Sequence, residues 1–347
     1  MIPVTVLTGF LGSGKTTLLG KLLKSPAFAR TAVIINEFGE VGLNHDLIET
    51  SDESFVTLQT GCLCCSIRGD LVLTLADILR RRDEGTVTRF ERVVIETSGL
   101  ADPAPILHAV MSDDALAERL TLAGVVTTVD AVHGEQTLAR QPESIKQVAV
   151  ADRLVLTKTD LVDATPAALT ERLAALNPAA PVLPVAFGDI DPARLFDARI
   201  WDASASSLPS PARARGLGWE NDEAHQHGAH DRNRHDERIA CFALIREQPI
   251  PAVALTLFLE MLAEHCGADL LRLKGIVAIA ESPDRPAVIH GVQHMFHAPG
   301  FLERWPSDDR RSRLVFIARD LPREFAEALL DAIEAEVRET VQDKNHS

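Results

Sequence analysis

The stretch GFLGSGKT, Gly9–Thr16, decides the fold of the first part of this sequence. It matches the pattern G-x-x-x-x-G-K-[ST], a glycine-rich loop whose backbone N–H groups surround the phosphates of a nucleotide. An apolar run at residues 4–8 precedes the loop, and the amphipathic run KTTLLGKLLK follows it. Because such a loop joins a strand to the N-terminus of a helix, the pattern and its context together predict a phosphate site.

Each residue of this loop has an expected role at the phosphates. Lys15 is predicted to neutralise the β- and γ-phosphate oxygens, and the hydroxyl of Thr16 to bind Mg²⁺ at the helix N-terminus. The glycines allow the backbone to curl around the phosphates. The predicted phosphate-binding residues are Gly9, Gly12, Ser13, Gly14, Lys15, Thr16 and Thr17.

A second motif, RVVIETSG at residues 92–99, places an acidic residue at the end of an apolar run. Glu96 fits a carboxylate that binds Mg²⁺, and Gly99 a backbone N–H near the γ-phosphate. We therefore predict that Lys15, Thr16 and Glu96 form the centre of nucleotide hydrolysis. The alternative is that Glu96 only caps the end of its strand.

A third motif, TKTD at residues 157–160, indicates the base. It resembles the guanine-specificity motif Asn-Lys-x-Asp. Asp160 can accept two hydrogen bonds from guanine N1–H and the 2-amino group, which adenine cannot supply, and the stem of Lys158 can lie along the base. Thr157 replaces the usual Asn, which we expect to weaken one hydrogen bond to the protein's own loops. The motif predicts GTP rather than ATP.

Apolar runs alternate with amphipathic stretches up to about residue 200, which predicts an α/β fold. A parallel sheet covered by helices on both faces has strands that are near-continuous runs of Val, Ile and Leu. Helices are predicted for KTTLLGKLLK, GDLVLTLADILRRR and PAALTERLAAL. Strands are predicted at residues 4–8, 32–36, 92–97, 123–130, 153–158 and 181–186.

The chain divides by composition into three segments. Residues 1–202 form the predicted P-loop nucleoside triphosphatase (NTPase) domain, and residues 203–237, rich in Ser, Pro, Gly and charge, a flexible linker. Residues 238–340 predict a smaller α+β domain, with a strand at 239–245, a helix at about 251–266, two or three further strands and a last helix.

The composition limits the function classes. A net charge of −15 argues against a nucleic-acid binder, which gains affinity from Lys and Arg against phosphates. The N-terminus lacks the basic region of a signal peptide, and no apolar stretch approaches the roughly 18 residues that span a bilayer. We therefore expect a cytoplasmic protein without membrane or nucleic-acid partners. Five cysteines in a reducing compartment indicate metal binding or redox chemistry rather than disulfides.

Five motifs in this order resemble those of the CobW family of P-loop GTPases. They are the P-loop, NEFGEVGLNHD (36–46), GCLCC (61–65), ETSGLADP (96–103) and TKTD. The stretches LLRLKGIVAI, VIHGVQHMF and DDRRSRLVFIARDL look like the C-terminal domain of that family. Its relatives insert nickel or cobalt into hydrogenase, urease and cobalamin. The resemblance implies a slow GTPase that acts as a metallochaperone, with zinc as the favoured cargo and cobalt as the alternative.

Cys62, Cys64 and Cys65 are the candidate ligands of this metal. Thiolates suit Zn²⁺ and Co²⁺, and structural zinc normally has four protein ligands, so three cysteines leave one position for a donor or acceptor protein. Gly61 allows a tight turn before the cluster, and we expect a helix to start near Ser66. A redox switch and ordinary core packing are the alternatives.

Glu37 lies in the stretch where a nucleotide-sensing switch segment is expected. The family resemblance implies that Glu37 is an added metal ligand or is linked to hydrolysis; water activation falls to Glu37 or to a water held by the backbone. If GTP orders this segment together with the cysteine loop, metal affinity must differ between the nucleotide states.

The remaining His and Cys residues have weaker signals. His225, His227, His230 and His235 in the linker fit loose metal collection and a solvated linker equally. His290, His294 and His297 fall on or beside a predicted strand, where His290 and His294 share a face; packing or partner contact is favoured over metal binding. Cys241 and Cys266 are predicted core residues.

Two rival functions fit parts of the sequence. One is a metal-independent P-loop ATPase or kinase with structural cysteines, and the other is a regulatory zinc-binding protein that only senses GTP. The favoured reading has an unknown client metalloprotein as partner, and a monomer or a homodimer as the assembly.

Overall fold

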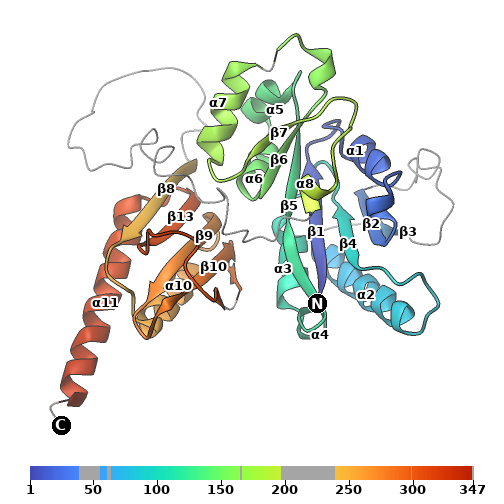
Figure 1. Ribbon diagram of the computed structural model, residues 1–347. Coiled ribbons are helices and arrows are strands. Elements are labelled where there is room, and N and C mark those ends of the chain that lie inside the picture. Colours follow the sequence, from blue (N-terminus) through green and yellow to red (C-terminus); the bar gives the residue numbers. More distant parts are fainter. Residues whose placement is uncertain (39–54, 61–63, 165, 197–238, 298, 346–347) are drawn as a thin grey trace. The chain divides into compact units, whose positions relative to one another are not determined.

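The structure is a computed structural model (Figure 1). It describes residues 1–38, 55–60, 64–164, 166–196, 239–297 and 299–345. The chain divides into two compact units, residues 1–202 and 203–347. The predicted linker at 203–237, with its four histidines, lies outside the described residues, as does Cys62.

The described residues of the first unit form a seven-stranded parallel sheet with the order β3-β2-β4-β1-β5-β6-β7. The strands are β1 (Ile2–Gly9), β2 (Thr31–Phe38), β3 (Phe55–Thr60), β4 (Arg92–Glu96), β5 (Leu120–Asp130), β6 (Arg153–Thr157) and β7 (Val182–Pro184). Because all strands run in the same direction, the residues that follow β1, β4, β5 and β6 meet at the carboxyl-terminal edge of the sheet.

Helices cover both faces of this sheet. They are α1 (Lys15–Leu22), α2 (Cys64–Asp83), α3 (Ala104–Ser112), α4 (Asp114–Ala117), α5 (Gly134–Arg140), α6 (Pro142–Ala149), α7 (Ala167–Leu176) and α8 (Ala193–Phe196). Leu19 of α1 and Phe196 of α8 pack with Leu7 and Val94 on one face. Helices α3 and α6 contact β5 and β1, where alternate residues such as Val6 are also buried.

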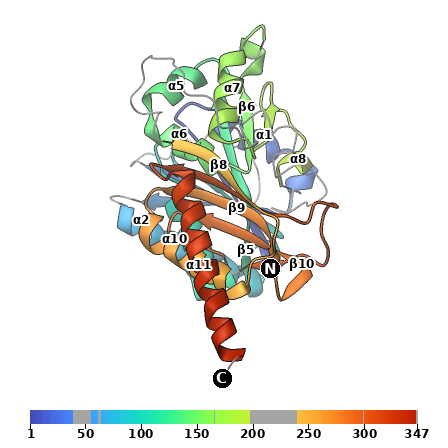
Figure 2. The ribbon, with the colours of Figure 1, turned by 90° about the vertical axis from the view of Figure 1, so that its left-hand side faces the viewer.

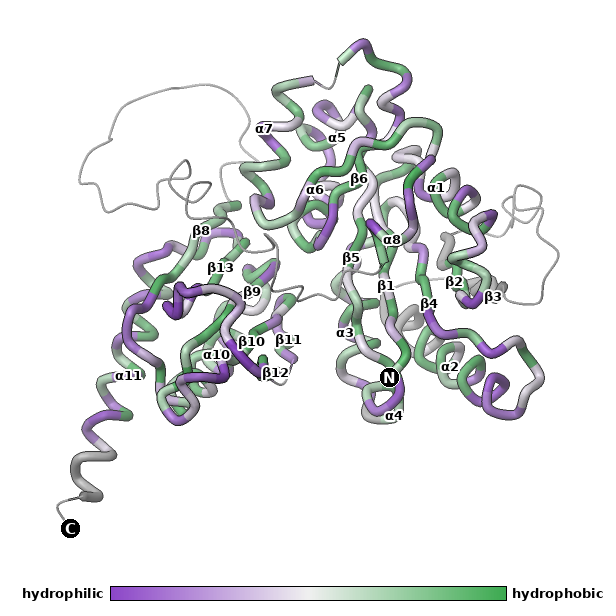
Figure 3. Tube along the Cα trace, viewed as in Figure 1, coloured by the Kyte–Doolittle hydropathy of each residue, from purple (hydrophilic) through white to green (hydrophobic). Residues whose placement is uncertain are grey.

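The sequence of the central strands explains this layered arrangement. Strand β4 is Arg-Val-Val-Ile-Glu, and four of its five residues are buried, so both of its faces need apolar cover. Figure 3 shows green, hydrophobic segments along β5, alternating with paler ones. The predicted α/β class is confirmed.

The structure adds elements that the sequence patterns did not predict. Strand β3 is a short edge strand whose sequence, Phe-Val-Thr-Leu-Gln-Thr, mixes apolar and polar residues without strict alternation. Helices α5 and α6 are short and separate, because Pro142 begins the first turn of α6. Such short elements contain too few turns for a clear period. Helix α2 begins at Cys64, two residues before the predicted start near Ser66.

In the second unit, the described residues form an antiparallel sheet with the order β11-β10-β9-β13-β8, and β12 pairs with β10. Figures 1 and 2 show α10 (Ala252–Cys266) and α11 (Arg323–Asn345) beside this sheet. The strands are β8 (Ile239–Arg246), β9 (Leu270–Ile279), β10 (Ser282–Val292), β11 (Met295–Phe296), β12 (Gly300–Phe301) and β13 (Ser312–Arg319). The predicted smaller α+β unit is thus confirmed, whereas its antiparallel pairing and the two short strands β11 and β12 were not predicted.

The core of the second unit lies between its sheet and its two helices. Phe258 of α10 packs edge-on against Phe316 of β13, whose ring stacks on Phe242 of β8. Cys266 belongs to this core, as predicted, and burial raises the pKa of the Cys241 thiol to about 12. Among the described residues, no helix is long and apolar enough to cross a bilayer.

The predicted pairing of His290 and His294 on one strand face is wrong. Strand β10 ends at Val292, and Gln293 has a positive φ of 53° in the turn before β11, so His294 leaves the strand. His294 Nδ1 contacts the carbonyl oxygen of Ala263 at 2.8 Å, whereas the His290 ring lies 6.2 Å from that of His297. Packing is therefore the role that these contacts favour.

Candidate functional site

The phosphate-binding loop begins where β1 ends and turns directly into α1. Gly9, Gly12 and Gly14 have φ angles of 141°, 72° and 93°, which side chains other than glycine rarely tolerate. A Cβ on Gly9 would also collide with Thr128 Oγ1. Gly14 is the residue before the first turn of α1, so the glycines of the motif allow the loop to close over the helix N-terminus.

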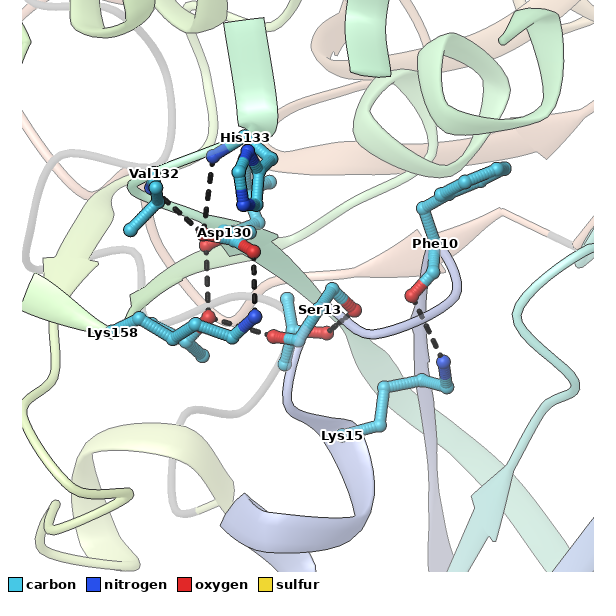
Figure 4. A network of polar contacts seen from close by, with 10 residues as sticks. Phe10, Ser13, Lys15, Asp130, Val132, His133 and Lys158 are labelled. Atoms are coloured by element: carbon cyan, nitrogen blue, oxygen red, sulfur yellow. Dashed lines mark hydrogen bonds and ion pairs between the residues drawn. The ribbon is translucent and has the colours of Figure 1, made fainter. Parts of the chain in front are cut away.

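Lys15 is folded back over this loop. Its Nζ donates hydrogen bonds to the carbonyl oxygens of Phe10, at 3.2 Å (Figure 4), and of Gly9, at 2.8 Å. The residue is 8% exposed. A nearly buried ammonium group at a helix N-terminus produces a strongly positive site. The loop is thus ready to receive an anion.

Thr16 and Glu96 come from positions 80 residues apart and meet at the sheet edge. Thr16 Oγ1 donates a hydrogen bond to Glu96 Oε1 at 2.9 Å, and Glu96 is 2% exposed. A hydroxyl and a carboxylate are oxygen ligands of the kind that Mg²⁺ prefers. The donor set therefore fits the predicted cation, and the reading of Glu96 as a mere strand cap does not account for the bond to Thr16.

Thr157, at the end of β6, is bonded to the phosphate-binding loop. Its Oγ1 is 2.7 Å from the carbonyl oxygen of Ser13 and 3.2 Å from that of Val129. The Ser13 hydroxyl in turn lies 2.6 Å from Thr128 Oγ1. Thr157, which stands where the motif usually has Asn, therefore makes its own hydrogen bond to the phosphate-binding loop.

Lys158 follows in the left-handed region, with φ of 57°, and its Nζ lies 2.6 Å from Asp130 Oδ2 (Figure 4). The backbone N–H groups of Val132 and His133 also donate to Asp130 Oδ1, at 2.7 and 3.2 Å. Burial alone would raise the pKa of the Asp130 carboxyl, but the hydrogen bonds from Lys158 and the two backbone groups outweigh it and lower that pKa. Lys158 thus has a fixed anionic partner.

Asp160 is exposed, and its Oδ1 accepts a hydrogen bond at 3.0 Å from the backbone N–H of Phe187, which follows β7. The carboxylate keeps acceptor capacity for a further donor, because each of its oxygens has two lone pairs. Asp160 is thus oriented by a neighbouring loop and open to solvent.

Gly99 touches the phosphate-binding loop from the side of β4. A Cβ on Gly99 would lie 2.6 Å from the backbone nitrogen of Leu11, so no larger residue fits. Buried Gln147 of α6 donates from Nε2 to the carbonyl oxygens of Gly99, at 3.2 Å, and Ala101, at 3.0 Å. Next to it, Lys146 forms an ion pair with Asp102 at 2.8 Å. Helix α6 therefore holds the loop that follows Glu96.

A cavity of about 180 Å³ lies beside the loop, between Phe10, Asp130 and α6. Gln147 lines it, as does Lys158. Neither Asp130 nor Gln147 was among the predicted site residues. Asp130 had a usable signal, since it is an acid at the end of an apolar strand, whereas Gln147 had none.

Three of the predicted transition-metal ligands, Glu37, Cys64 and Cys65, belong to described elements. Glu37 is in β2, where its backbone pairs with that of Gln59, and β3 ends at Thr60, directly before GCLCC. Cys64 and Cys65 begin α2, and Cys62 lies outside the described residues. No group of three His, Cys, Asp or Glu residues forms a metal site within the part of the chain that the structure describes.

Thr157→Val is expected to lower the free energy of unfolding by about 1–3 kcal/mol, because it removes a buried hydroxyl and its hydrogen bond to the Ser13 carbonyl oxygen, the shorter of its two contacts. Thermal unfolding with and without GDP measures this change. Thr157→Ser keeps the hydroxyl and should retain most of the stability. The control Thr170→Val, on the exposed surface of α7, should have almost no effect. Equal unfolding temperatures for the two valine variants would contradict the prediction.

Two family models match the chain. Residues 3–184 match the nucleotide-binding domain of CobW/HypB/UreG, and residues 239–334 match the C-terminal domain of the cobalamin synthesis protein CobW. The two matched segments thus correspond to a nucleotide-binding domain followed by a CobW-type C-terminal domain.

Named relatives and solved structures agree with these matches. The zinc chaperone YjiA of Escherichia coli is 35% identical over 93% of this chain and 96% of its own length. The zinc chaperone CobW of a Sinorhizobium species is 29% identical over 82% of this chain and 83% of its own length. A crystal structure of Zn(II)-bound YjiA GTPase has a TM-score of 0.69 and 29% identity, covering 96% of this chain and 98% of that one.

Proposed function

The chain belongs to the CobW/HypB/UreG family of nucleotide-binding proteins, and from this we propose that it is a GTP-hydrolysing metallochaperone that carries zinc. The observation that carries the nucleotide part is the hydrogen bond between Thr157 and Ser13. It joins the segment expected to read guanine to the loop expected to hold the phosphates. The residues predicted to bind the base and those predicted to bind the phosphates of GTP are therefore linked to each other at the carboxyl ends of the strands.

Phosphate binding falls to the loop amides and to Lys15. The lysine can exchange the Gly9 and Phe10 carbonyl oxygens for phosphate oxygens of much higher charge, because both sets of acceptors lie over the same loop. Thr16 and Glu96 would hold Mg²⁺, which would offset the charge on the phosphates during hydrolysis. Gly99, held by Gln147, would present its backbone N–H to the γ-phosphate.

Guanine selection falls to Asp160. Its carboxylate would accept the N1–H and 2-amino groups of the base, while the Phe187 N–H fixes its orientation. Asp130 would hold the Lys158 stem along the base by its ion pair. Adenine offers no matching pair of donors, and it would leave the Asp160 carboxylate without them.

Zinc would bind to the thiolates of Cys62, Cys64 and Cys65, with Glu37 as an added ligand or as a link to hydrolysis. Three lines support this: the softness of thiolates, the zinc chaperones among the relatives, and the backbone pairing of Glu37 beside the strand that leads into GCLCC.

Coupling between the two ligands follows from this arrangement. Strand β2 lies between β3 and β4, so the metal segment and the Glu96 segment are separated by one strand. If GTP changes the metal affinity, metal must change the GTP affinity by the same factor. We propose that hydrolysis lowers the zinc affinity and so releases the metal to a client metalloprotein.

The experiment is a competition between GTP and ATP for the protein, measured by calorimetry with and without Zn²⁺. We expect GTP to bind at least about 100-fold more tightly than ATP, because a site built for hydrogen bonding rejects a ligand that lacks the donors. Asp160→Asn should narrow this ratio, whereas Asp163→Asn, an exposed acid three residues later, should leave it unchanged. Comparable affinities of the wild type for both nucleotides would contradict the proposal and favour an ATPase or a kinase.

A further inference from the structure

Phe187 is an exposed aromatic residue in an unfavourable backbone conformation. Its side chain is 70% exposed, and its φ is 54°, in the left-handed region. A bulky residue rarely adopts that backbone conformation. An exposed aromatic ring also contributes no hydrophobic free energy to folding, because it stays in contact with water. Both features are costs to the free protein, and such costs persist mainly at functional sites.

The other residues in this conformation make the contrast clear. Within the described residues, the non-glycine residues with positive φ are Lys158, Phe187, Gln293 and Asp320. Gln293 and Asp320 are polar residues in turns of the second unit. Lys158 and Phe187 follow the neighbouring strands β6 and β7. The two non-glycine residues with positive φ in the described part of the first unit therefore both lie after adjacent strands.

The turn that contains Phe187 is attached at two points to the expected nucleotide site. The Phe187 backbone N–H donates to Asp160 Oδ1 at 3.0 Å. The next residue, Gly188, has φ of 72°, and a Cβ there would lie 3.3 Å from the carbonyl oxygen of Thr17 in α1. The turn therefore bridges the carboxylate expected to read the base and the helix expected to hold the phosphates.

This geometry limits where the ring can be. In the proposed complex, the Phe187 nitrogen and the donor edge of guanine would meet the same carboxylate, so the ring and the base would lie within about one side-chain length of each other. The Lys158 stem is on the strand β6 side, where Asp130 holds its end. Phe187 follows the neighbouring strand β7, so a base bound to Asp160 would have Lys158 on one side and Phe187 on the other.

We propose that the phenyl ring of Phe187 stacks on the guanine base, opposite the stem of Lys158. The proposal rests on the proposed GTP binding and names the residue that supplies its base-stacking surface. Because stacking uses the face of the base and not its edge, Phe187 would strengthen GTP and GDP binding equally and leave guanine selection to Asp160.

The test compares Phe187→Gly and Phe187→Tyr with the wild type by calorimetric titration of GDP and of a non-hydrolysable GTP analogue. For Phe187→Gly we expect Kd to rise by about 5- to 100-fold for both nucleotides, with an unchanged ratio between them. Its melting temperature without nucleotide should equal or exceed that of the wild type, because glycine tolerates the positive φ. Phe187→Tyr should restore nucleotide affinity to within about threefold, because it keeps an aromatic ring.

A matched control is Phe325→Ala, which removes an exposed ring of α11, 46% exposed, and should leave both Kd values unchanged. If Phe187→Gly binds both nucleotides within twofold of the wild type, the ring does not stack on the base and the inference is wrong. A wild type that binds neither guanine nucleotide would overturn the proposed function as well, so the two failures are distinguishable.

Discussion

Lys15→Ala is expected to reduce the rate of GTP hydrolysis by about 100- to 1000-fold, the cost of removing one preorganised electrostatic contact from a transition state. The Lys15 ammonium is nearly buried and already lies over the loop, at 2.8 Å from the Gly9 carbonyl oxygen. It would exchange its carbonyl partners for phosphate oxygens when the nucleotide binds, and so be in place before the transition state forms. Single-turnover hydrolysis at saturating GTP, followed by phosphate release, measures the effect.

The same variant should also lose stability, because Lys15 donates to two carbonyl oxygens of the loop. Removing a charged donor costs about 1.5–3 kcal/mol, which thermal unfolding without nucleotide would detect. The control is Lys24→Ala, which removes an exposed cation just after α1 and should change neither quantity. Wild-type hydrolysis by Lys15→Ala would mean that the phosphates bind elsewhere.

The parts of the fold that could be predicted from sequence are those with a local signal. The P-loop combines a strand, three glycines and a helix within about twenty residues, and its pattern is readable without any tertiary contact. The central strands are runs of Val, Ile and Leu because both sheet faces are covered. The family resemblance, which rests on five such motifs, is confirmed by the domain matches.

The parts that could not be predicted depend on contacts between distant residues. Gln147 reaches Gly99 across 48 positions, and nothing in the α6 sequence marks it as different from a surface glutamine. Thr157 looked like a loss relative to Asn, yet its short side chain reaches the Ser13 carbonyl oxygen. Phe187 was not singled out because positive φ has no sequence signal outside Gly, Asn and Asp.

The same reasoning explains why the edge strand β3 was difficult to predict from the sequence. Strand β3 pairs only with β2 and has no neighbour on its other side among the described residues, so its sequence does not need a continuous apolar run. Its existence matters for function, because it places the backbone that leads into the cysteines beside Glu37. The proximity of the two motifs therefore comes from a strand that the periodicity did not predict.

Replacement of Cys62, Cys64 and Cys65 by serine should weaken Zn²⁺ binding in the GTP-bound state by more than about 100-fold. Changing one outer-shell partner of a metal ligand already costs about 10- to 100-fold, and here three thiolates are lost. The affinity for a GTP analogue without metal should remain within about threefold. Titration of zinc against a chelator, with the GTP analogue and with GDP, measures both nucleotide states.

The remaining cysteines are poor substitutes for these ligands. Burial raises the pKa of Cys241 to about 12, and burial together with the charge of Asp269 raises that of Cys266, so both thiols stay protonated near neutral pH. Cys241→Ala is therefore the matched control and should bind zinc like the wild type. Tight zinc binding that survives the triple replacement must use ligands other than Cys62, Cys64 and Cys65.

The readout must be the dependence of zinc affinity on the nucleotide rather than the presence of zinc. A bound ion alone does not identify the transfer site, because His, Asp and Glu side chains elsewhere on a protein can also ligate zinc. We expect the wild type to hold zinc at least tenfold more tightly with the GTP analogue than with GDP, which corresponds to about 1.4 kcal/mol of coupling. The triple variant should lose this difference. If it keeps the difference, the cysteines are not the site that GTP controls, whatever else they bind.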